Sequence, residues 1–273
     1  MKEKNKSITE LILQTQGIDL SKYETVFLNK SVQKRMDDTF FKLEAEYIGY
    51  LKQSHLESEI FLNSLQISYT EFFRNSLTFS VLEKIIIPSI AMKRKSSNRN
   101  EIRIWSAACA GGQETYSLAM LLNEFSNGHG EKINFRIFAT DQSEKQIQEA
   151  QLGQYPEFSL NCLNLKRTKQ WFIKKEDTYS VRPELRENID FSVFDLFSDQ
   201  FSCPPTSIFG DFDIIVCANL LFYYNSESQK KIIKKVRNCL SKNGYLITGE
   251  SEREILIKSG FIEVYPQSAI FQL

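Results

Sequence analysis

The stretch Ile102–Met120, which reads IRIWSAACAGGQETYSLAM, decides the fold class of this chain. Its first part, Ile102–Ala108, is a short apolar run that predicts a buried strand. The pair Gly111-Gly112 then marks a turn. The following residues, Gln113–Phe125, place Leu118, Leu121 and Leu122 on one helical face. The sequence therefore predicts a strand, a turn and a helix in succession.

The same alternation continues toward the C-terminus. Three further apolar runs read as strands: FRIFATD at Phe135–Asp141, FDIIVCAN at Phe212–Asn219 and GYLITGES at Gly244–Ser251. Ser143 and Ser226 each have a glutamine three residues later, the capping-box pattern that starts a helix. Residues 261–273 predict a closing antiparallel hairpin. Strands that alternate with helices predict an α/β fold with a mostly parallel sheet.

Changes in this rhythm predict the domain boundaries. Residues 1–92 read as a helical domain, because apolar residues recur at near-helical spacing among Lys, Asp and Glu. Residues 93–100, KRKSSNRN, contain no apolar residue and predict a linker. Residues 101–273 form the α/β domain, and short alternating stretches at about 165–194 predict a small antiparallel insertion within it.

The composition limits the partners and the compartment. The chain has 273 residues, with 34 Lys and Arg against 34 Asp and Glu, so its formal net charge is zero. This balance argues against nucleic acid or an anionic membrane as the main partner. The N-terminus has no signal-peptide pattern, and the most apolar run, 214–224, is far shorter than the roughly 18 residues of a spanning helix. We therefore expect a cytoplasmic protein without membrane insertion.

The cysteines and histidines predict neither disulfides nor a metal site. The five cysteines are scattered without a C-x-x-C pair, and there are only two histidines. The sequence also lacks a G-x-S-x-G elbow and a Walker A loop. The Gly111-Gly112 turn lacks the G-x-G-x-x-G spacing, which disfavours NAD.

A nucleoside-type cofactor at the carboxyl ends of the parallel strands remains the favoured ligand. Asp141 ends the second strand, where a carboxylate can accept two ribose hydroxyls, and Glu114 begins the helix after the glycine turn. Each residue also has a plain structural interpretation. An acid at a helix N-terminus stabilises the helix dipole, and an Asp at a strand end often caps the next element.

Six motifs follow one another along the chain: SYTEFFRN (Ser68–Asn75), WSAACAGGQETYSLAM (Trp105–Met120), FATDQSEKQIQEAQLGQY (Phe138–Tyr155), LRENIDFSVFDLF (Leu185–Phe197), FDIIVCANLLFYYNSESQ (Phe212–Gln229) and GYLITGESE (Gly244–Glu252). In these motifs and their order the chain resembles the CheR family of chemotaxis receptor methyltransferases, which use S-adenosylmethionine (SAM) to methylate protein glutamates. The resemblance runs from about Ile18 to the C-terminus. It implies a small all-α N-terminal domain and a doubly wound class I methyltransferase sheet with a small antiparallel β-subdomain.

The resemblance also implies the functional residues. The cofactor would be bound by Ser68, Thr70, Arg74, Ala108, Glu114, Asp141, Asp195, Leu196, Ala218 and Asn219. Within that set, Glu114 would lie near the methionine moiety and Asp141 would hold the ribose hydroxyls. Asp195 and Leu196 would frame the adenine. Arg74 and Tyr223 would be the catalytic residues that position the glutamate substrate, and no metal would take part.

Several positions depart from the family pattern. AACAGGQE at residues 107–114 stands where the family usually has AGCSTGEE, so Ala108, Ala110, Gly111 and Gln113 differ. Ala218 stands where an Arg is common. Two alternatives to an active receptor methyltransferase therefore stay open: a degenerate module that binds SAM, its product S-adenosylhomocysteine (SAH) or a receptor, and a methyltransferase for a different acceptor. The expected partner is a methyl-accepting chemoreceptor or another acidic helical protein, and the expected state is a monomer.

Overall fold

A computed structural model describes residues 4–65, 69–95, 101–128 and 133–273. Packing divides the chain into two compact units. The smaller unit is Met1–Ile67 with Leu221–Lys231, and the larger unit is Ser68–Leu220 with Ile232–Leu273.

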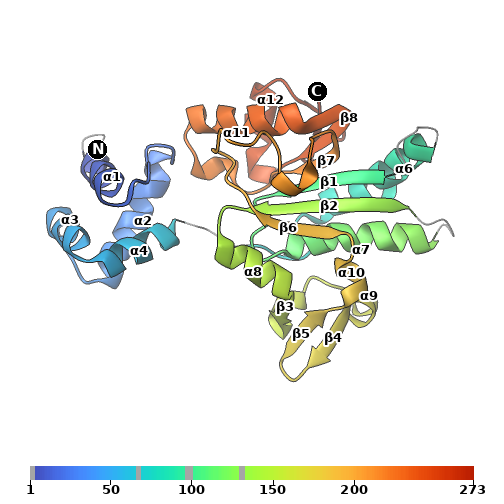
Figure 1. The fold of residues 1–273 in the computed structure, drawn as a ribbon, viewed down its shortest axis with the longest axis horizontal. Helices are drawn as coiled ribbons and strands as arrows, with labels where there is room; N and C mark the ends of the chain where they lie inside the picture. Colours follow the sequence, from blue (N-terminus) through green and yellow to red (C-terminus); the bar gives the residue numbers. More distant parts are fainter. Residues whose placement is uncertain (1–3, 66–68, 96–100, 129–132) are drawn as a thin grey trace. The chain divides into compact units, whose positions relative to one another are not determined.

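The larger unit is built on a seven-stranded sheet (Figure 1). Its strand order is β6-β2-β1-β7-β8-β10-β9. The strands are β1 (Glu101–Ala107), β2 (Asn134–Asp141), β6 (Ile189–Val193), β7 (Phe212–Val216), β8 (Leu240–Ile247), β9 (Ile262–Glu263) and β10 (Ile270–Gln272). The pairs from β6 to β8 are parallel, and β10 is antiparallel to both β8 and β9. The predicted mostly parallel sheet with a closing antiparallel hairpin is confirmed.

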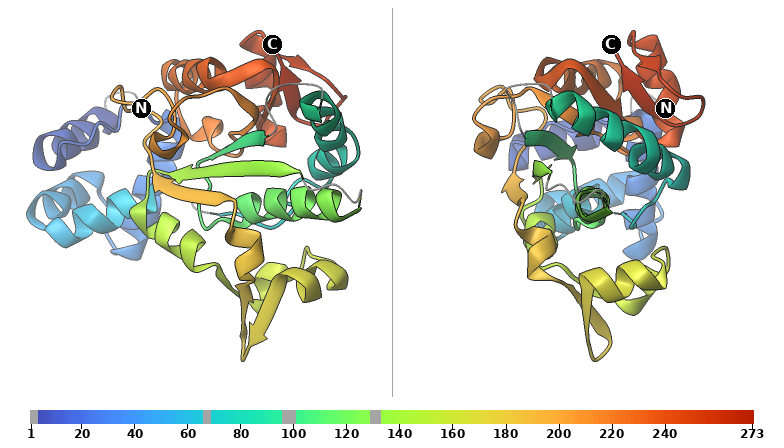
Figure 2. Two further views of the ribbon diagram at one scale, coloured as in Figure 1. Left: turned by 45° about the vertical axis from the view of Figure 1, so that its right-hand side comes forward. Right: turned by 90° about the vertical axis from the view of Figure 1, so that its right-hand side faces the viewer.

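Helices cover both faces of this sheet. In Figures 1 and 2, α7 and α8 lie on one side and α11 and α12 on the other. The helices after residue 68 are α5 (Ser76–Val81), α6 (Ile87–Lys95), α7 (Gln113–Gly128), α8 (Glu144–Leu152), α9 (Leu165–Trp171), α10 (Pro183–Arg186), α11 (Ser226–Cys239) and α12 (Arg253–Lys258). Shorter turns are the π-helical η1 (Leu82–Ile86) and the 3-10 turns η2 (Glu157–Leu160), η3 (Pro205–Ser207) and η5 (Glu250–Glu252). The 3-10 turn η4 (Leu221–Tyr223) belongs to the smaller unit. This arrangement confirms the expected doubly wound class I methyltransferase fold.

Helix caps explain where two of these helices begin. Ser143 accepts the N–H of Gln146 at 3.4 Å, as its capping box predicts. The prediction for Ser226 was wrong, because the cap of α11 is the preceding residue. Asn225 Oδ1 accepts the N–H of Ser228 at 2.9 Å, which places Ser226 inside the helix.

The segment before the sheet packs with the α/β core. Leu82, Ile86 and Ile90 belong to the same buried cluster as Ile104 of β1 and Leu118 of α7. The contacts therefore group helices α5 and α6 with the larger unit. The domain boundary at 92 stays a prediction. Of the predicted linker, residues 93–95 end α6, and residues 96–100 lie outside the described part of the chain.

A small antiparallel sheet branches from the larger unit, as expected. Its order is β3-β5-β4, with β3 (Gln154–Pro156), β4 (Phe172–Lys175) and β5 (Thr178–Val181). It differs in extent from the predicted insertion at 165–194. It takes in β3 upstream, and residues 189–193 instead pair parallel with β2 as an edge of the main sheet.

The smaller unit contains the expected N-terminal helices α1 (Lys4–Gln16), α2 (Thr25–Asp38), α3 (Glu44–Gln53) and α4 (His55–Ser64). Its core is made of Ile8, Ile12, Leu20, Leu28, Val32, Met36, Tyr47, Leu51, Phe61 and Leu65. Across the described helices of both units, none is both long and apolar enough to cross a membrane.

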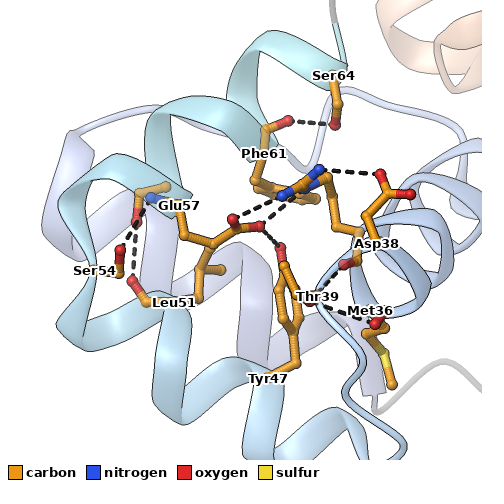
Figure 3. Close-up of polar contacts among 11 residues, drawn as sticks. Met36, Asp38, Thr39, Tyr47, Leu51, Ser54, Glu57, Phe61 and Ser64 are labelled. Carbon is orange, nitrogen blue, oxygen red and sulfur yellow. Dashed lines mark hydrogen bonds and ion pairs between the residues drawn. The ribbon is translucent and has the colours of Figure 1, made fainter.

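A buried ion pair joins the helices of this unit (Figure 3). Arg35 of α2 donates to Glu57 of α4 through Nε at 2.9 Å and Nη2 at 2.8 Å. The Tyr47 hydroxyl of α3 donates to the same carboxylate at 2.9 Å. Burial, and then the bond to Glu57, raise the pKa of Tyr47 well above its ordinary value. Three helices thus share one hydrogen-bonded carboxylate, which satisfies a charge that would be costly to bury alone.

A segment from the far end of the sequence completes the smaller unit. The Tyr224 ring stacks on Tyr23 with ring centroids 5.2 Å apart. The backbone N–H of Glu24 donates to the Tyr223 carbonyl at 2.8 Å, and the N–H of Asn225 donates to the Lys22 carbonyl at 3.0 Å. Residues 221–231 therefore pack with the N-terminal helices although sequence order places them after β7.

Candidate functional site

The carboxyl ends of the parallel strands bring most of the predicted site residues to one edge of the main sheet. Register aligns Ala107 of β1 with Thr140 of β2, and Asp141 with Val193 of β6. On the other side of β1, Ser106 is opposite Val216 of β7. Asp141 ends β2, and Glu114 lies in the first turn of α7. The loops that follow the strands carry the other predicted residues, Ala108, Asp195, Leu196, Ala218 and Asn219.

The turn after β1 is tight and strained. Ala108 has φ 61° and Ala110 has φ 46°, in the left-handed region that residues with a Cβ rarely adopt. Gly112 has φ 90°, and an added Cβ there would lie 3.0 Å from Ala150 Cβ of α8. The hydroxyl of Tyr155, from β3, donates to the Gly111 carbonyl at 2.7 Å. The turn is thus fixed by α8 and the small sheet.

Asp141 ties this turn to the end of β2. Its Oδ2 accepts the N–H of Ala110 at 3.0 Å, and its Oδ1 accepts the N–H of Ser143 at 2.9 Å. Burial raises the pKa of Asp141, and the backbone N–H groups oppose this shift. The carboxylate is therefore fixed in orientation at the strand end, where the sequence predicts a contact with ribose.

Glu114, the second residue of α7, is a partly buried acid in a hydrogen-bonded chain. The Ser106 hydroxyl donates to Glu114 Oε1 at 2.8 Å and accepts from the Thr115 hydroxyl at 3.1 Å. Burial raises the pKa of Glu114 to about 7. The bond from Ser106 and the positive charge of Arg74 oppose that shift, and the charge of Glu252 adds to it. This environment favours a cationic ligand, which would stabilise the ionised carboxylate.

The segment Thr70–Arg74 packs within the larger unit. Phe72 is fully buried and lies edge-on to Tyr155 and Phe172 of the small sheet, with centroids 5.1 and 5.5 Å away. Phe73 has φ 51°, and its N–H donates to Ser117 Oγ of α7 at 3.0 Å. The partly buried Thr70 precedes these anchors. They fix the backbone that presents Arg74.

Arg74 itself is exposed. Its Nη1 donates to the Tyr69 carbonyl at 3.1 Å, and its guanidinium lies 5.1 Å from the centroid of the Tyr69 ring. Its charge acts on Glu114, as the pKa of that acid shows. A guanidinium held in this way can still bind a carboxylate through its remaining N–H groups.

The other predicted residues differ in exposure. Asp195 is exposed, and its Oδ1 accepts the N–H of Phe197 at 2.8 Å, whereas Leu196 is buried. The N–H of Phe194 donates to the Asp141 carbonyl at 2.9 Å, which holds this loop beside the end of β2. Ala218 is partly buried against the main core.

Two predicted residues are not placed with this group. Tyr223 belongs to the smaller unit, where its ring lies 4.9 Å from that of Phe27. Ser68 lies outside the described residues.

Sequence reasoning missed Glu252, which follows β8. It is fully buried and accepts the backbone N–H of Asn219 at 2.8 Å. The only signal in the sequence is a glutamate three residues after Gly249, which resembles a helix-start pattern. Among the described residues, no group of three or more His, Cys, Asp or Glu side chains could hold a metal ion.

Comparisons with known proteins identify the family to which this chain is similar. Residues 68–264 match the family described as "CheR methyltransferase, SAM binding domain". The chain is 31% identical over 245 residues to a "Chemotaxis protein methyltransferase" of Listeria innocua, covering 90% of this chain and 88% of that protein. A protein of the same description from Borreliella burgdorferi is 29% identical over 254 residues, covering 92% and 88% of the two chains. The family match spans every site residue named above.

Proposed function

Because the chain belongs to the CheR methyltransferase family, we propose that it transfers the methyl group of SAM to glutamate carboxylates of a chemoreceptor, giving glutamyl methyl esters and SAH. The observation that carries this proposal is the cluster of fixed acids, Glu114 and Asp141, at the carboxyl edge of the matched domain. A cytoplasmic monomer that acts on an acidic receptor helix is part of the same proposal.

The described residues fit SAM as the methyl donor. When bound, SAM supplies a methyl group on a positively charged sulfonium. Glu114 suits the cationic amino end of the ligand, because burial raises the pKa of this acid to about 7 and a nearby cation would lower it again. Asp141 suits the ribose, because a carboxylate has about four acceptor positions and can bind hydroxyls in addition to its backbone donors.

We assign the remaining cofactor contacts from the places of these residues near the ends of the strands. Asp195 and Leu196 would frame the adenine beside the end of β6. Asn219 and Ala218 after β7, and Ala108 after β1, would form the wall of the site. Thr70 and Arg74 would reach the methionine end. Ser68, which lies outside the described residues, would also bind the cofactor.

The acceptor needs alignment more than activation. A glutamate side chain has an ordinary pKa of about 4.3, so the nucleophile is ionised at neutral pH and needs no general base. Arg74 would hold one oxygen of that carboxylate by a charge-assisted hydrogen bond while the other oxygen attacks. The Tyr223 hydroxyl would orient the same group. Attack of an anion on a sulfonium neutralises both charges, which a site shielded from water favours.

The degenerate alternative is not favoured. The relatives compared above are described as methyltransferases, and the chain keeps Arg74, Glu114, Asp141 and Asn219. The departures at Ala108, Gln113 and Ala218 leave these side chains in place.

Arg74 provides the test of this mechanism. The rate of methyl transfer from SAM to a purified chemoreceptor signalling domain should fall about 100-fold in Arg74→Ala. It should fall less in Arg74→Lys, which keeps the charge but loses the planar fork. The matched control is Arg237→Ala, an exposed arginine in the last turn of α11, which should leave the rate unchanged. Equal rates in Arg74→Ala and Arg237→Ala would contradict the role of Arg74. An intact chain that binds neither SAM nor SAH would contradict the function itself.

A further inference from the structure

Glu252 is a fully buried acid that none of the roles above uses. It ends the 3-10 turn η5 directly after β8. Three donors converge on its Oε2, each at 2.8 Å: the backbone N–H of Asn219, the backbone N–H of Gly249 and the hydroxyl of Thr248. One carboxylate oxygen therefore joins the loop after β7 to the loop after β8.

This oxygen fixes the backbone of Asn219. Asn219 has φ 59°, a left-handed conformation that asparagine tolerates better than most residues. The hydrogen bond from its own N–H to Glu252 holds the peptide in that conformation. The orientation of Asn219, a proposed wall of the cofactor site, thus depends on a residue in another loop.

Gly249 fixes the side chain of Asn219 as well. A Cβ added at Gly249 would lie 2.9 Å from Asn219 Oδ1, 3.1 Å from Asn219 Cγ and 3.0 Å from Glu252 Oε2. The asparagine amide therefore packs directly against a glycine backbone, and a side chain there would displace it. Glycine is required here for close approach, since Gly249 has φ −72°.

The Glu252 carboxylate accepts the N–H of Asn219, a proposed wall of the cofactor site, so its charge lies beside that wall. It acts on Glu114, at the start of α7, and makes ionisation of that acid less favourable. Two acidic side chains, Glu114 and Glu252, therefore influence one another where β1, β7 and β8 end. In methyl transfer the bond from sulfur to methyl carbon breaks and the bond from carboxylate oxygen to that carbon forms. The sulfonium becomes an uncharged thioether, so SAM carries one more positive charge than SAH.

We propose that Glu252 is a positioning residue for Asn219 and that its negative charge makes the site favour SAM relative to SAH. This inference rests on the proposed function, because it assumes that SAM and SAH are the ligands. Binding measurements can distinguish the positioning of Asn219 from the effect of the Glu252 charge. Loss of positioning weakens both ligands alike, whereas loss of charge weakens SAM more than SAH.

Calorimetric titration of the full chain with SAM and with SAH tests the charge. In Glu252→Gln, the ratio of the SAH Kd to the SAM Kd should fall roughly 5- to 10-fold from its wild-type value, the size expected for one partly screened charge. Thr248→Val removes one donor without changing the charge, and it should leave the ratio unchanged. Glu250→Gln makes the same charge change at an exposed position of the same turn and should also leave the ratio unchanged.

Hydrogen exchange of the ligand-free chain tests the positioning. The amides of Asn219 and Gly249 should exchange faster in Glu252→Gln than in wild type and should be unaffected in Glu250→Gln. Glu252→Asp keeps the charge on a shorter side chain, so it should loosen these amides while keeping the wild-type ratio of the two Kd values. If Glu252→Gln does not fold, the exchange measurement on Glu252→Asp still tests the positioning role.

Three results would overturn the inference. An unchanged Kd ratio in Glu252→Gln removes the charge role, and unchanged exchange of both amides removes the positioning role. A ratio that shifts equally in Glu250→Gln makes the effect a general surface-charge effect. Failure of the wild-type chain to bind either compound is a different result, because it contradicts the proposed function and leaves the exchange measurement to decide the positioning.

Discussion

Ala108 and Ala110 hold backbone conformations that glycine adopts at much lower cost. Their φ values of 61° and 46° lie in the left-handed region, where a Cβ meets the following carbonyl. We expect Ala108→Gly to raise the free energy of unfolding by about 1 kcal/mol, because it relieves this strain. Ala107→Gly is the matched control, because Ala107 is the buried last residue of β1. This substitution should lower the free energy of unfolding by about 1 kcal/mol. Urea unfolding measures both, and a destabilised Ala108→Gly would contradict strain at this turn.

Glu114 should make the stability of the ligand-free protein depend on pH. Burial raises the pKa of Glu114 from 4.5 to about 7, so between these values the folded chain keeps a proton that the unfolded chain releases. The free energy of unfolding should therefore fall with rising pH by about 1.4 kcal/mol per unit across this window. Burial is the main cause of this raised pKa; the hydrogen bond from Ser106 and the charge of Arg74 lower it, and the charge of Glu252 raises it further.

The control for this dependence is Glu114→Gln, which cannot titrate. Its unfolding free energy, followed by urea titration at pH 5, 6 and 7, should lack this component of the slope. Identical slopes in the two proteins would show that Glu114 has an ordinary pKa. Saturating SAM should reduce the slope of the wild type, because a bound cation lowers the pKa of a neighbouring acid.

At the scale of elements, Tyr155 links the small sheet to the glycine turn. Its hydroxyl reaches the Gly111 carbonyl at 2.7 Å, and its ring lies edge-on to Phe72 before Arg74. We expect Tyr155→Phe to lower the free energy of unfolding by about 1–2 kcal/mol, because a buried carbonyl loses its donor. SAM binding should weaken several-fold as the turn loosens.

Tyr179→Phe is the control on the same small sheet. The Tyr179 hydroxyl donates to the exposed carboxylate of Glu157 at 3.3 Å. Its removal should change stability by less than about 0.5 kcal/mol and leave the SAM Kd unchanged. Equal losses in both variants would argue against a link between β3 and the turn.

The sequence predicted the elements whose patterns are strongest. The strands β1, β2 and β7 read as continuous apolar runs because parallel strands are buried on both faces. The edge strand β6 was assigned to the antiparallel insertion instead. Its residues are only partly buried, so its alternating pattern resembles that of a small exposed sheet. Register with β2, and not local pattern, places it in the main sheet.

At the scale of the molecule, the sequence identified acids that end strands but not the residues that hold them. Asp141 and Glu114 were predictable because strand ends and helix starts are visible in the pattern. Glu252 was not, because its three donors come partly from the loop of Asn219, distant in sequence. The packing of Tyr224 on Tyr23 was missed for the same reason. Contacts between segments far apart in the chain leave no periodic signal.

The nature of the methylated product tests the central claim most directly. The full chain is incubated with methyl-labelled SAM and a chemoreceptor signalling domain, and the modified residues are located by mass spectrometry. We predict label on glutamate side chains that mild base releases as methanol, since a carboxyl ester hydrolyses readily. Label that resists base, or that lies on lysine, arginine or cysteine, would contradict a glutamate methyltransferase. So would a receptor that stays unlabelled while the chain binds SAM.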